Sequence, residues 1–263
     1  MAEILSPRPA ATVITLRDGA NGYEILMLRR NLKGDFVGGA YVFPGGRVDE
    51  SDAGPLAERL TFGLSDAVAS LRLSLESGAL AYYVACLREL FEEAGLLVAC
   101  TPGGEPVRIS DDESVRLVAS RREVNAGTLD FLSMMEREGF LLDLRGLEYV
   151  GHWVTPTGLS RRFDTRFFVL LAPAGQVATH DAGETIADQW IRPVDALAAH
   201  DRGELEMMFP TVRNLEAIAH LRTSHDVLDY ARSLQNIVKM ESKIVTRDGE
   251  MVILLPGDDG YDD

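Results

Sequence analysis

The segment from Arg88 to Leu96 constrains the fold of this chain more than any other stretch of its sequence. Three acidic residues stand at the helical spacing i, i+3 and i+4, so a helix places them on one face: Glu89, Glu92 and Glu93. A second face carries an apolar stripe that can pack on a core, formed by Leu87, Leu90, Phe91 and Ala94. The pattern predicts an amphipathic helix over Leu80–Ala94 that ends at Gly95, where a positive φ is favourable.

Three carboxylates on one helical face repel one another unless a positive charge lies among them. A hard divalent cation such as Mg²⁺ meets that need, because it prefers oxygen ligands. The helix is therefore a candidate metal site.

The composition excludes several classes of function. A formal net charge of −15 argues against a non-specific nucleic-acid binder and against attachment to an acidic membrane, since both need a basic surface. No run approaches the length of a membrane span and the first residues lack the apolar core of a signal peptide, so we expect a cytoplasmic protein. The two cysteines, Cys86 and Cys100, are expected to be buried free thiols.

A glycine pair precedes the acidic helix. A short strand predicted over 41–43 runs into Pro44-Gly45-Gly46, where the missing side chains let a ligand or metal approach a backbone carbonyl. The alternative is a simple tight turn. Residues 50–78 then interrupt the pattern with short helical fragments, and we interpret them as an insertion beside the main fold.

The remaining elements follow from periodicity and turn residues. Two strands over 11–15 and 23–29 flank a glycine-containing turn and form a hairpin. Helices are predicted over 110–124, 127–138, 193–200, 211–221 and 225–240, further strands over 96–99, 147–154 and 163–171, and a terminal hairpin over 243–255.

A local basic cluster stands out in this acidic chain. Arg161, Arg162 and Arg166 fall within six positions at the start of a predicted strand. Exposed arginines at such a place commonly serve only solubility. Guanidinium groups also suit phosphate oxygens, which makes these three candidates for binding a phosphate-bearing substrate.

Gly46 and the segment Arg88–Leu96 together resemble the Nudix box, in which a glycine is followed downstream by R-E-U-x-E-E-x-G-U with U apolar. The second half matches at every specified position. Two features depart from the family pattern: Gly46 and Arg88 stand 42 positions apart because of the insertion, and Leu80 replaces a glutamate expected eight positions before the arginine. Either Glu76 supplies the lost acid or the acid is dispensable.

The resemblance implies an α/β fold, the Nudix α/β/α sandwich with a mixed central sheet, plus a helical insertion and C-terminal helices. On this resemblance, we expect residues 1–263 to form a single Nudix hydrolase domain. Residues 50–78 would be an insertion within the Nudix box, and residues 205–263 a C-terminal helical extension that ends in the hairpin. Carried onto matching positions, the family roles make Mg²⁺ or Mn²⁺ the cofactor, with Glu89, Glu92, Glu93 and the Gly46 carbonyl as ligands. Arg88 would hold Glu92 in place, and the general base would be Glu89 or Glu184, an acid from a later loop.

An interrupted box resembles the branch of the family that cleaves coenzyme A and acyl-coenzyme A. Segments 36–46, 153–156, 161–168 and 254–258 also resemble that branch. The implied substrate is a nucleoside diphosphate-linked small molecule, with Arg161, Arg162 and Arg166 on its phosphates and Phe36 or Trp153 stacked on adenine. Two alternatives stay open: a hydrolase for ADP-ribose or NADH, and a catalytically silent regulatory module. A homodimer is compatible with the sequence.

Overall fold

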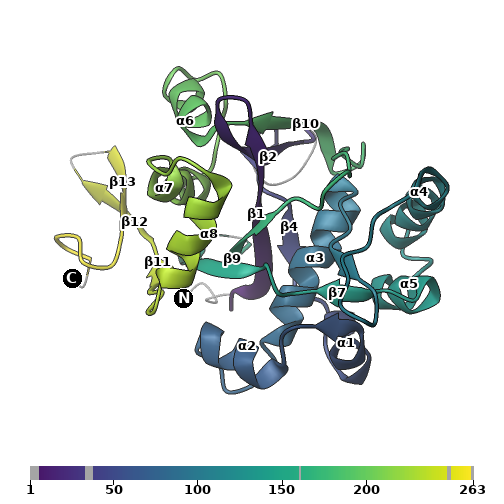
Figure 1. Ribbon diagram of the computed structural model, residues 1–263. Coiled ribbons are helices and arrows are strands. Elements are labelled where there is room, and N and C mark those ends of the chain that lie inside the picture. Colours follow the sequence, from purple (N-terminus) through teal and green to yellow (C-terminus); the bar gives the residue numbers. More distant parts are fainter. Residues whose placement is uncertain (1–5, 33–37, 160, 248–249, 262–263) are drawn as a thin grey trace.

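The computed structural model describes residues 6–32, 38–159, 161–247 and 250–261, and its centre is a mixed eight-stranded sheet (Figure 1). Two neighbouring pairs, β1 with β9 and β8 with β11, are parallel, and the other pairs are antiparallel. The strands follow the order β10 (Thr185–Ile191), β2 (Gly22–Arg30), β1 (Arg8–Gly19), β9 (Phe163–Leu171), β8 (Glu148–Val154) and β11 (Lys239–Glu241), with β3 (Tyr41–Val42) beside β2 and β4 (Gly45–Arg47) beside β1.

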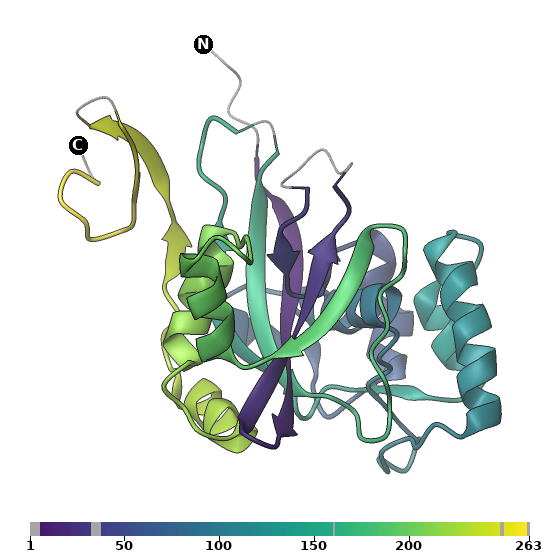
Figure 2. The same ribbon diagram turned by 90° about the horizontal axis from the view of Figure 1, so that it is seen from above.

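Helices cover both faces of this sheet, which confirms the predicted α/β/α sandwich (Figures 1 and 2). One face packs on α3 (Leu80–Ala94), with α1 (Pro55–Leu60) and α2 (Asp66–Leu73) next to it. The other face packs on α6 (Pro193–Asp201), α7 (Phe209–Ile218) and α8 (Ser224–Ser233). Strand β1 is buried on both sides and accordingly reads as a nearly continuous apolar run.

The first hairpin confirms the turn chemistry of the sequence. Strands β1 and β2 pair in antiparallel register from Leu16 opposite Ile25 to Gly19 opposite Gly22. Gly22 has a φ of 113°, a conformation that side chains disfavour. The predicted helix over Leu80–Ala94 is confirmed at both ends, and Gly95 closes it with a φ of 70°.

The segment 50–78, which the sequence predicts to be an insertion, forms helices and a short strand beside α3. It contains a 3₁₀ turn η1 (Glu50–Asp52), α1, the short strand β5 (Thr61–Phe62) and α2. Strand β5 pairs with β7 (Leu141–Asp143), which also pairs with β6 (Ala99–Cys100), so the insertion joins a separate three-stranded sheet. The Asp66 carboxylate accepts hydrogen bonds from Gly78 N (2.9 Å) and Leu80 N (2.9 Å), which fixes the start of α3.

Two further helices lie beside the C-terminal end of α3. Helix α4 (Asp111–Asn125) confirms the helix predicted from position 110, and it starts at a capping box in which Ser110 and Glu113 bind each other's backbone amides. Helix α5 (Phe131–Glu138) starts later than predicted, at an Asp130 cap, and ends at Gly139. Both cysteines are buried and free, which confirms their predicted state.

Two predicted elements were wrong in extent. The strand expected over 96–99 is reduced to Ala99–Cys100, because the Leu97 backbone binds the Gln176 side chain (2.8 and 2.9 Å) in place of a neighbouring strand. The helix expected over 225–240 ends at Ser233, where Leu234 turns extended and the chain goes on to pair with β8 as β11. Edge pairing along β8 overrides the local helical pattern there.

The chain ends in the hairpin of β12 (Lys243–Arg247) and β13 (Glu250–Leu254), as predicted, and it projects from the helix layer of α7 and α8 (Figure 2). In the described part of the chain, no helix has both the length and the apolar character required to cross a membrane.

Candidate active site

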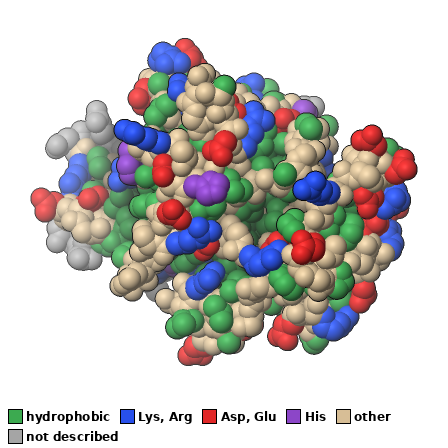
Figure 3. Space-filling view, in the orientation of Figure 1, with side chains coloured by type: hydrophobic (Ala, Val, Ile, Leu, Met, Phe, Trp, Pro, Cys, Tyr) green, Lys and Arg blue, Asp and Glu red, His purple; other side chains and the backbone are tan. Residues whose placement is uncertain are grey.

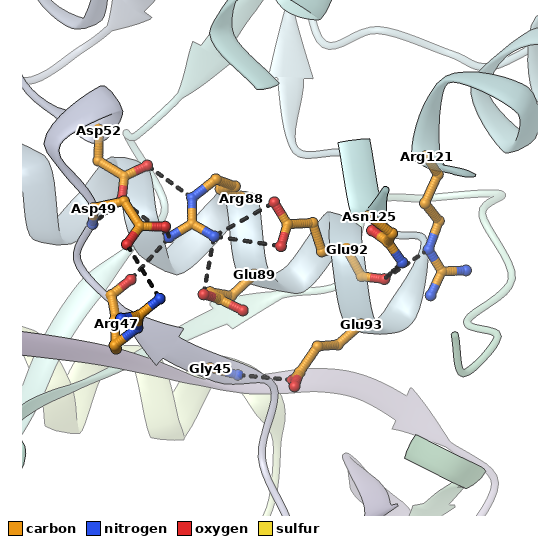
Figure 4. A network of polar contacts seen from close by, with 10 residues as sticks. All are labelled: Gly45, Arg47, Asp49, Asp52, Arg88, Glu89, Glu92, Glu93, Arg121 and Asn125. Carbon is orange, nitrogen blue, oxygen red and sulfur yellow. Dashed lines mark hydrogen bonds and ion pairs between the residues drawn. The ribbon is translucent and has the colours of Figure 1, made fainter. Parts of the chain in front are cut away.

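The carboxylates of α3 face the strand that carries the glycine pair (Figure 4). Their positions follow from the sequence, because the apolar stripe of α3 is buried in the core and turns the acidic face toward β4. Gly45 and Gly46 lie on β4, which pairs with β1 beneath the helix. The apposition of Gly46 and the acidic helix, predicted across the long insertion, is therefore present in the structure.

Arg88 organises this acidic face from a buried position. Its guanidinium donates to Asp52 through Nε (2.8 Å) and Nη2 (3.0 Å), and to the carbonyl oxygen of Arg47 (2.8 Å). It also reaches Glu89 at 2.9 Å and both oxygens of Glu92 at 3.3 and 3.4 Å. Burial alone would lower the pKa of Arg88, but the bonds to Asp52 and the adjacent glutamates raise it, so the group stays charged. The predicted contact between Arg88 and Glu92 is confirmed.

Glu89 lies directly against the backbone of Gly46. A Cβ atom added at Gly46 would fall on the Glu89 carboxylate, so only glycine leaves room for this approach. Burial raises the pKa of Glu89 to about 7, while Arg88 opposes the shift and Glu92 adds to it. A partly buried carboxylate beside an exposed-backbone glycine is a suitable oxygen donor pair for a metal ion.

Glu93 points toward the same strand and is only 7 % exposed. It accepts a hydrogen bond from Gly45 N at 3.0 Å (Figure 4). Burial raises the pKa of Glu93 well above its usual range, and the charges of Glu89 and Glu184 raise it further. This region therefore holds more buried negative charge than its positive groups compensate.

The donor set fits a divalent cation. Over the described ranges, no three acidic, histidine or cysteine side chains converge into a ready metal cage, because Glu92 is turned toward Arg88. The carboxylates of Glu89, which shares Arg88 with Asp52 and Glu92, and of Glu93 nevertheless supply hard oxygen ligands of the kind that Mg²⁺ and Mn²⁺ take.

Of the other predicted acidic and aromatic site residues, only Glu184 lies at this face among the described residues. Glu184 directly precedes β10, and its backbone carbonyl accepts from Asn31 N (2.8 Å). Its charge contributes to the raised pKa of Glu93, so it borders the site as expected. Phe36 lies outside the described residues. Leu80 is buried in the core at the start of α3 and Glu76 is exposed, so neither places a carboxylate in this network.

The predicted arginine cluster does not act as a unit. Arg162 is buried and donates to the carbonyls of Thr155 (3.0 Å) and Pro156 (3.1 Å) and to Glu241 (2.8 Å), so its guanidinium fastens its own loop to β11. Arg161 is exposed, whereas Arg166 faces α3 from β9. A common phosphate clamp of all three is therefore not formed.

Trp153 lies on the opposite side of the sheet from α3. Its indole packs edge-on against Phe209 (5.9 Å between centroids) within the second apolar cluster and is buried there. Strand alternation explains this, because Trp153 pairs with Thr165 while its neighbour His152 pairs with Arg166 on the α3 side. The geometry gives no support to stacking of this ring on adenine.

Three residues of this site carried no signal in the sequence. Asp52 comes from the insertion, is 1 % exposed and binds Arg88 from outside the helix. Arg30 on β2 lies close enough to Glu93 to oppose its pKa shift, and Arg30 Nε is buried without a hydrogen-bond partner. Arg121 on α4 donates to the Glu92 carbonyl (2.9 Å), and its Nη2 is likewise unpartnered. A lone arginine in a strand or a helix predicts nothing by itself.

The fold and this carboxylate-bearing helix define the chain as a Nudix hydrolase. More particularly, it belongs to the family of the NUDT19 Nudix domain, whose model matches residues 69–218, more than half of the chain. Nudix hydrolases generally need divalent metal ions, in keeping with the oxygen donors of α3.

Relatives with assigned names agree with this family. The chain is similar to "Acyl-coenzyme A diphosphatase NUDT19" of Xenopus laevis, at 26 % identity over 93 % of this chain and 73 % of that protein. It is similar to the protein of the same name in Homo sapiens at 28 % identity, over 92 % of this chain and 73 % of that one. Among solved structures, a NUDIX hydrolase from Alicyclobacillus acidocaldarius matches with a TM-score of 0.66 and 30 % identity, covering 85 % of this chain and 96 % of that one.

Proposed function

We propose that this chain hydrolyses the diphosphate bond of coenzyme A or of an acyl-coenzyme A. Water adds across the P–O–P bridge, so one phosphoryl group gains the new oxygen and the other leaves with the bridging oxygen. The products are adenosine 3′,5′-bisphosphate and phosphopantetheine or its acyl form. The names of the relatives support this substrate class.

The observation that carries the proposal is the contact between α3 and β4. Glu89 is partly buried against Gly46 and Glu93 is buried against Gly45, both with raised pKa values, and two such carboxylates fit a divalent cation. Mg²⁺ or Mn²⁺ would be held by Glu89, Glu92, Glu93 and the Gly46 carbonyl. Such an ion neutralises phosphoryl charge and lowers the pKa of bound water.

Two residues remain as candidates for the general base. Glu89 lies beside the proposed metal position, where its carboxylate can accept a proton from metal-bound water. Glu184 borders Glu93 from a loop that is tied to β2 through Asn31. Glu89→Gln would remove both a ligand and a base, whereas Glu184→Gln would remove only the base, so metal affinity measured beside turnover separates the two.

Arg30 and Arg121 are the cations best placed for the diphosphate. Each has a buried nitrogen without a hydrogen-bond partner and lies within electrostatic reach of the α3 glutamates. Guanidinium groups in such a place suit phosphate oxygens. We assign them the role that the sequence gave to Arg161 and Arg162.

The deciding experiment compares coenzyme A, acetyl-coenzyme A, ADP-ribose and NADH, each with Mg²⁺, with Mn²⁺ or with EDTA, and identifies the products by mass spectrometry. We expect phosphopantetheine from coenzyme A or its thioester with metal and none with EDTA. Faster cleavage of ADP-ribose or NADH would transfer the proposal to that substrate. Tight nucleotide binding without cleavage of any diphosphate would favour a catalytically silent regulatory module. The presence of Leu80 in place of a Nudix-box glutamate is compatible with that alternative. A cytoplasmic location and a homodimer stay predictions of the sequence.

A further inference from the structure

A second polar cavity lies beyond the other half of α3. It has a volume of about 990 Å³ and is bordered by α2, by β8 and β9, and by the segment that follows α8. Its lining includes none of the Nudix-box residues, and the polar side chains that matter to it are Arg72, Glu148, Tyr149, Arg166, Arg232 and Lys239. Ligand sites of small molecules are commonly about 300–1,000 Å³, so the cavity suffices for a nucleotide-sized molecule.

The lining is basic although the chain is acidic. Four cations border the cavity, namely Arg72, Arg166, Arg232 and Lys239, against one carboxylate, Glu148. Basic side chains are visible on the surface between α8 and α2 (Figure 3). Glu148 pairs with Arg232 at 3.0 Å and is 3.9 Å from Arg72, and Lys239 pairs with Glu241 at 3.0 Å. These contacts leave one cation of the lining without an acidic partner.

That cation is Arg166, which is only 5 % exposed. Its Nε has no hydrogen-bond partner, and Nη1 makes one long contact of 3.5 Å with Tyr149 Oη. Within the described chain, no carboxylate lies at ion-pair distance from it, because the nearby Asp164 binds His152 at 2.6 Å. Its guanidinium lies 5.8 Å from the ring centroid of Tyr82 on α3. Asp164 acts on Arg166 only from beyond ion-pair distance, so this buried guanidinium has no direct ion-pair partner among the described residues, and such a position favours an anion.

The strand register relates Arg166 to the candidate metal site. Arg166 pairs with Ala11, and Ala11 pairs with Gly46, so the two residues lie two strands apart on one sheet. At about 4.8 Å per strand, their backbones are roughly 10 Å apart. This separation is within the length of one extended nucleotide-containing ligand, whereas the Ala11 side chain that lies between the two positions is fully buried.

We propose that this cavity binds a phosphomonoester, with Arg166 as its anchor and Arg72 at its rim. The planar guanidinium fork suits the terminal oxygens of such a group. If the proposed function holds, the group is the 3′-phosphate of the coenzyme A substrate. A free phosphorylated nucleotide that occupies the same position is the other source of this chemistry.

Binding is measured first, without catalysis. Titration of the full chain with adenosine 3′,5′-bisphosphate in EDTA is followed by calorimetry, with AMP as the probe that lacks the 3′-phosphate. We expect saturable binding of the bisphosphate that is weakened roughly tenfold or more in Arg166→Gln and to a smaller extent in Arg72→Gln. Arg202→Gln, an exposed pair with Glu204 elsewhere, is the control for net charge. Equal affinity of the parent and Arg166→Gln, or no saturable binding by the parent, would overturn the proposal.

Stability distinguishes a binding arginine from a structural one. Removing an unpaired buried charge should raise the melting temperature of Arg166→Met in phosphate-free buffer, while the gain in melting temperature on adding the bisphosphate is lost. A structural arginine would give a lower melting temperature instead. Arg72→Gln, at an exposed rim position, carries the binding test if Arg166 variants fold poorly.

Kinetics identifies the source of the phosphate. A substrate subsite predicts that the preference for coenzyme A over dephospho-coenzyme A, as kcat/KM, falls about tenfold in Arg166→Gln. A free ligand predicts that this ratio is unchanged and that added bisphosphate alters cleavage of dephospho-coenzyme A in the parent only. If the chain cleaves none of the diphosphates tested, the proposed function is contradicted. The measured binding of the bisphosphate would still support the phosphomonoester site.

Discussion

The two halves of α3 present opposite charge problems. Its C-terminal half carries Glu89 and Glu93, which lie against β4 with more negative charge than their neighbours balance. Its N-terminal half packs beside Arg166, a buried cation without a carboxylate at ion-pair distance in the described chain. The C-terminal half therefore has an excess of negative charge, and the N-terminal half has an excess of positive charge.

The two problems have different outcomes in the free protein. A carboxylate can take up a proton, and the pKa of Glu89 is already raised to about 7 by burial. A guanidinium has no such neutral form available in proteins, so a cation in this position is balanced by an anion instead. The sign of the excess charge at each site is the reason why we propose a metal ion at one and a phosphate at the other.

Glu93→Gln tests the acidic half with the largest expected effect. The amide keeps the shape and the hydrogen bond from Gly45 N but removes the charge that would bind a cation. We expect turnover to fall by about 10³-fold, as when an electrostatic group that stabilises the transition state is lost. The measurement is product formation from coenzyme A with Mg²⁺, beside a circular dichroism spectrum. Near-normal turnover would remove Glu93 from the site, and the exposed Glu123→Gln is the control.

Asp52→Asn tests how the acidic half keeps Arg88 in place. Asp52 is buried and makes two bonds to Arg88, so the substitution leaves a buried guanidinium short of its main partner. Breaking a buried ion pair costs about 3 kcal/mol or more, and we expect a loss of this size in the free energy of unfolding by urea.

Asp49→Asn is the matched control for that substitution. Asp49 also faces Arg88, at 3.6 Å, but it is half exposed. Its loss should change the free energy of unfolding by less than about 1 kcal/mol. Equal effects of the two substitutions would contradict the anchoring role of Asp52.

Substitutions at the two glycines distinguish an effect on metal binding from an effect on the stability of the fold. A Cβ at Gly46 would meet the Glu89 carboxylate, a movable side chain, whereas a Cβ at Gly45 would meet Ala11 O at 2.5 Å and Thr12 Cα at 2.7 Å. Gly46→Ala should therefore weaken Mn²⁺ binding by about tenfold or more with little change in stability. Gly45→Ala should lower the free energy of unfolding by about 1–3 kcal/mol. Calorimetric metal titration and urea unfolding measure the two effects, and the reverse pattern would contradict this placement of Glu89.

The sequence predicted the acidic half well because its signals are local. Helical spacing placed Glu89, Glu92 and Glu93 on one face, and Gly95 marked the end of α3. The matching of Gly46 with this helix required the family pattern, since 42 positions separate Gly46 from Arg88. Their roles as metal ligands stay predictions until metal binding is measured.

The basic half could not be predicted in the same way. Three neighbouring arginines looked like one cluster, yet Arg162 is fastened by Glu241, 79 positions away, and Arg166 faces a cavity closed by α2 and the segment after α8. Strand alternation and distant pairings decide where such side chains lie. Asp52 was missed for the same reason, because its partner Arg88 lies 36 positions further along.

Asp66→Asn has the smallest expected effect and tests what fixes the start of the basic half of α3. Its carboxylate, from α2, accepts hydrogen bonds from Gly78 N and Leu80 N and so caps the start of α3. The bonds from Leu80 N and Gly78 N lower the pKa of Asp66, so its contribution to stability is present above its ordinary pKa near 3.8 and is lost as the pH falls through the lowered value. We expect the parent to exceed Asp66→Asn by about 1 kcal/mol in free energy of unfolding at pH 7 and by less near pH 3. Urea unfolding at the two pH values measures this difference. A difference that grows toward pH 3 would contradict the cap, because protonated Asp66 resembles asparagine in charge.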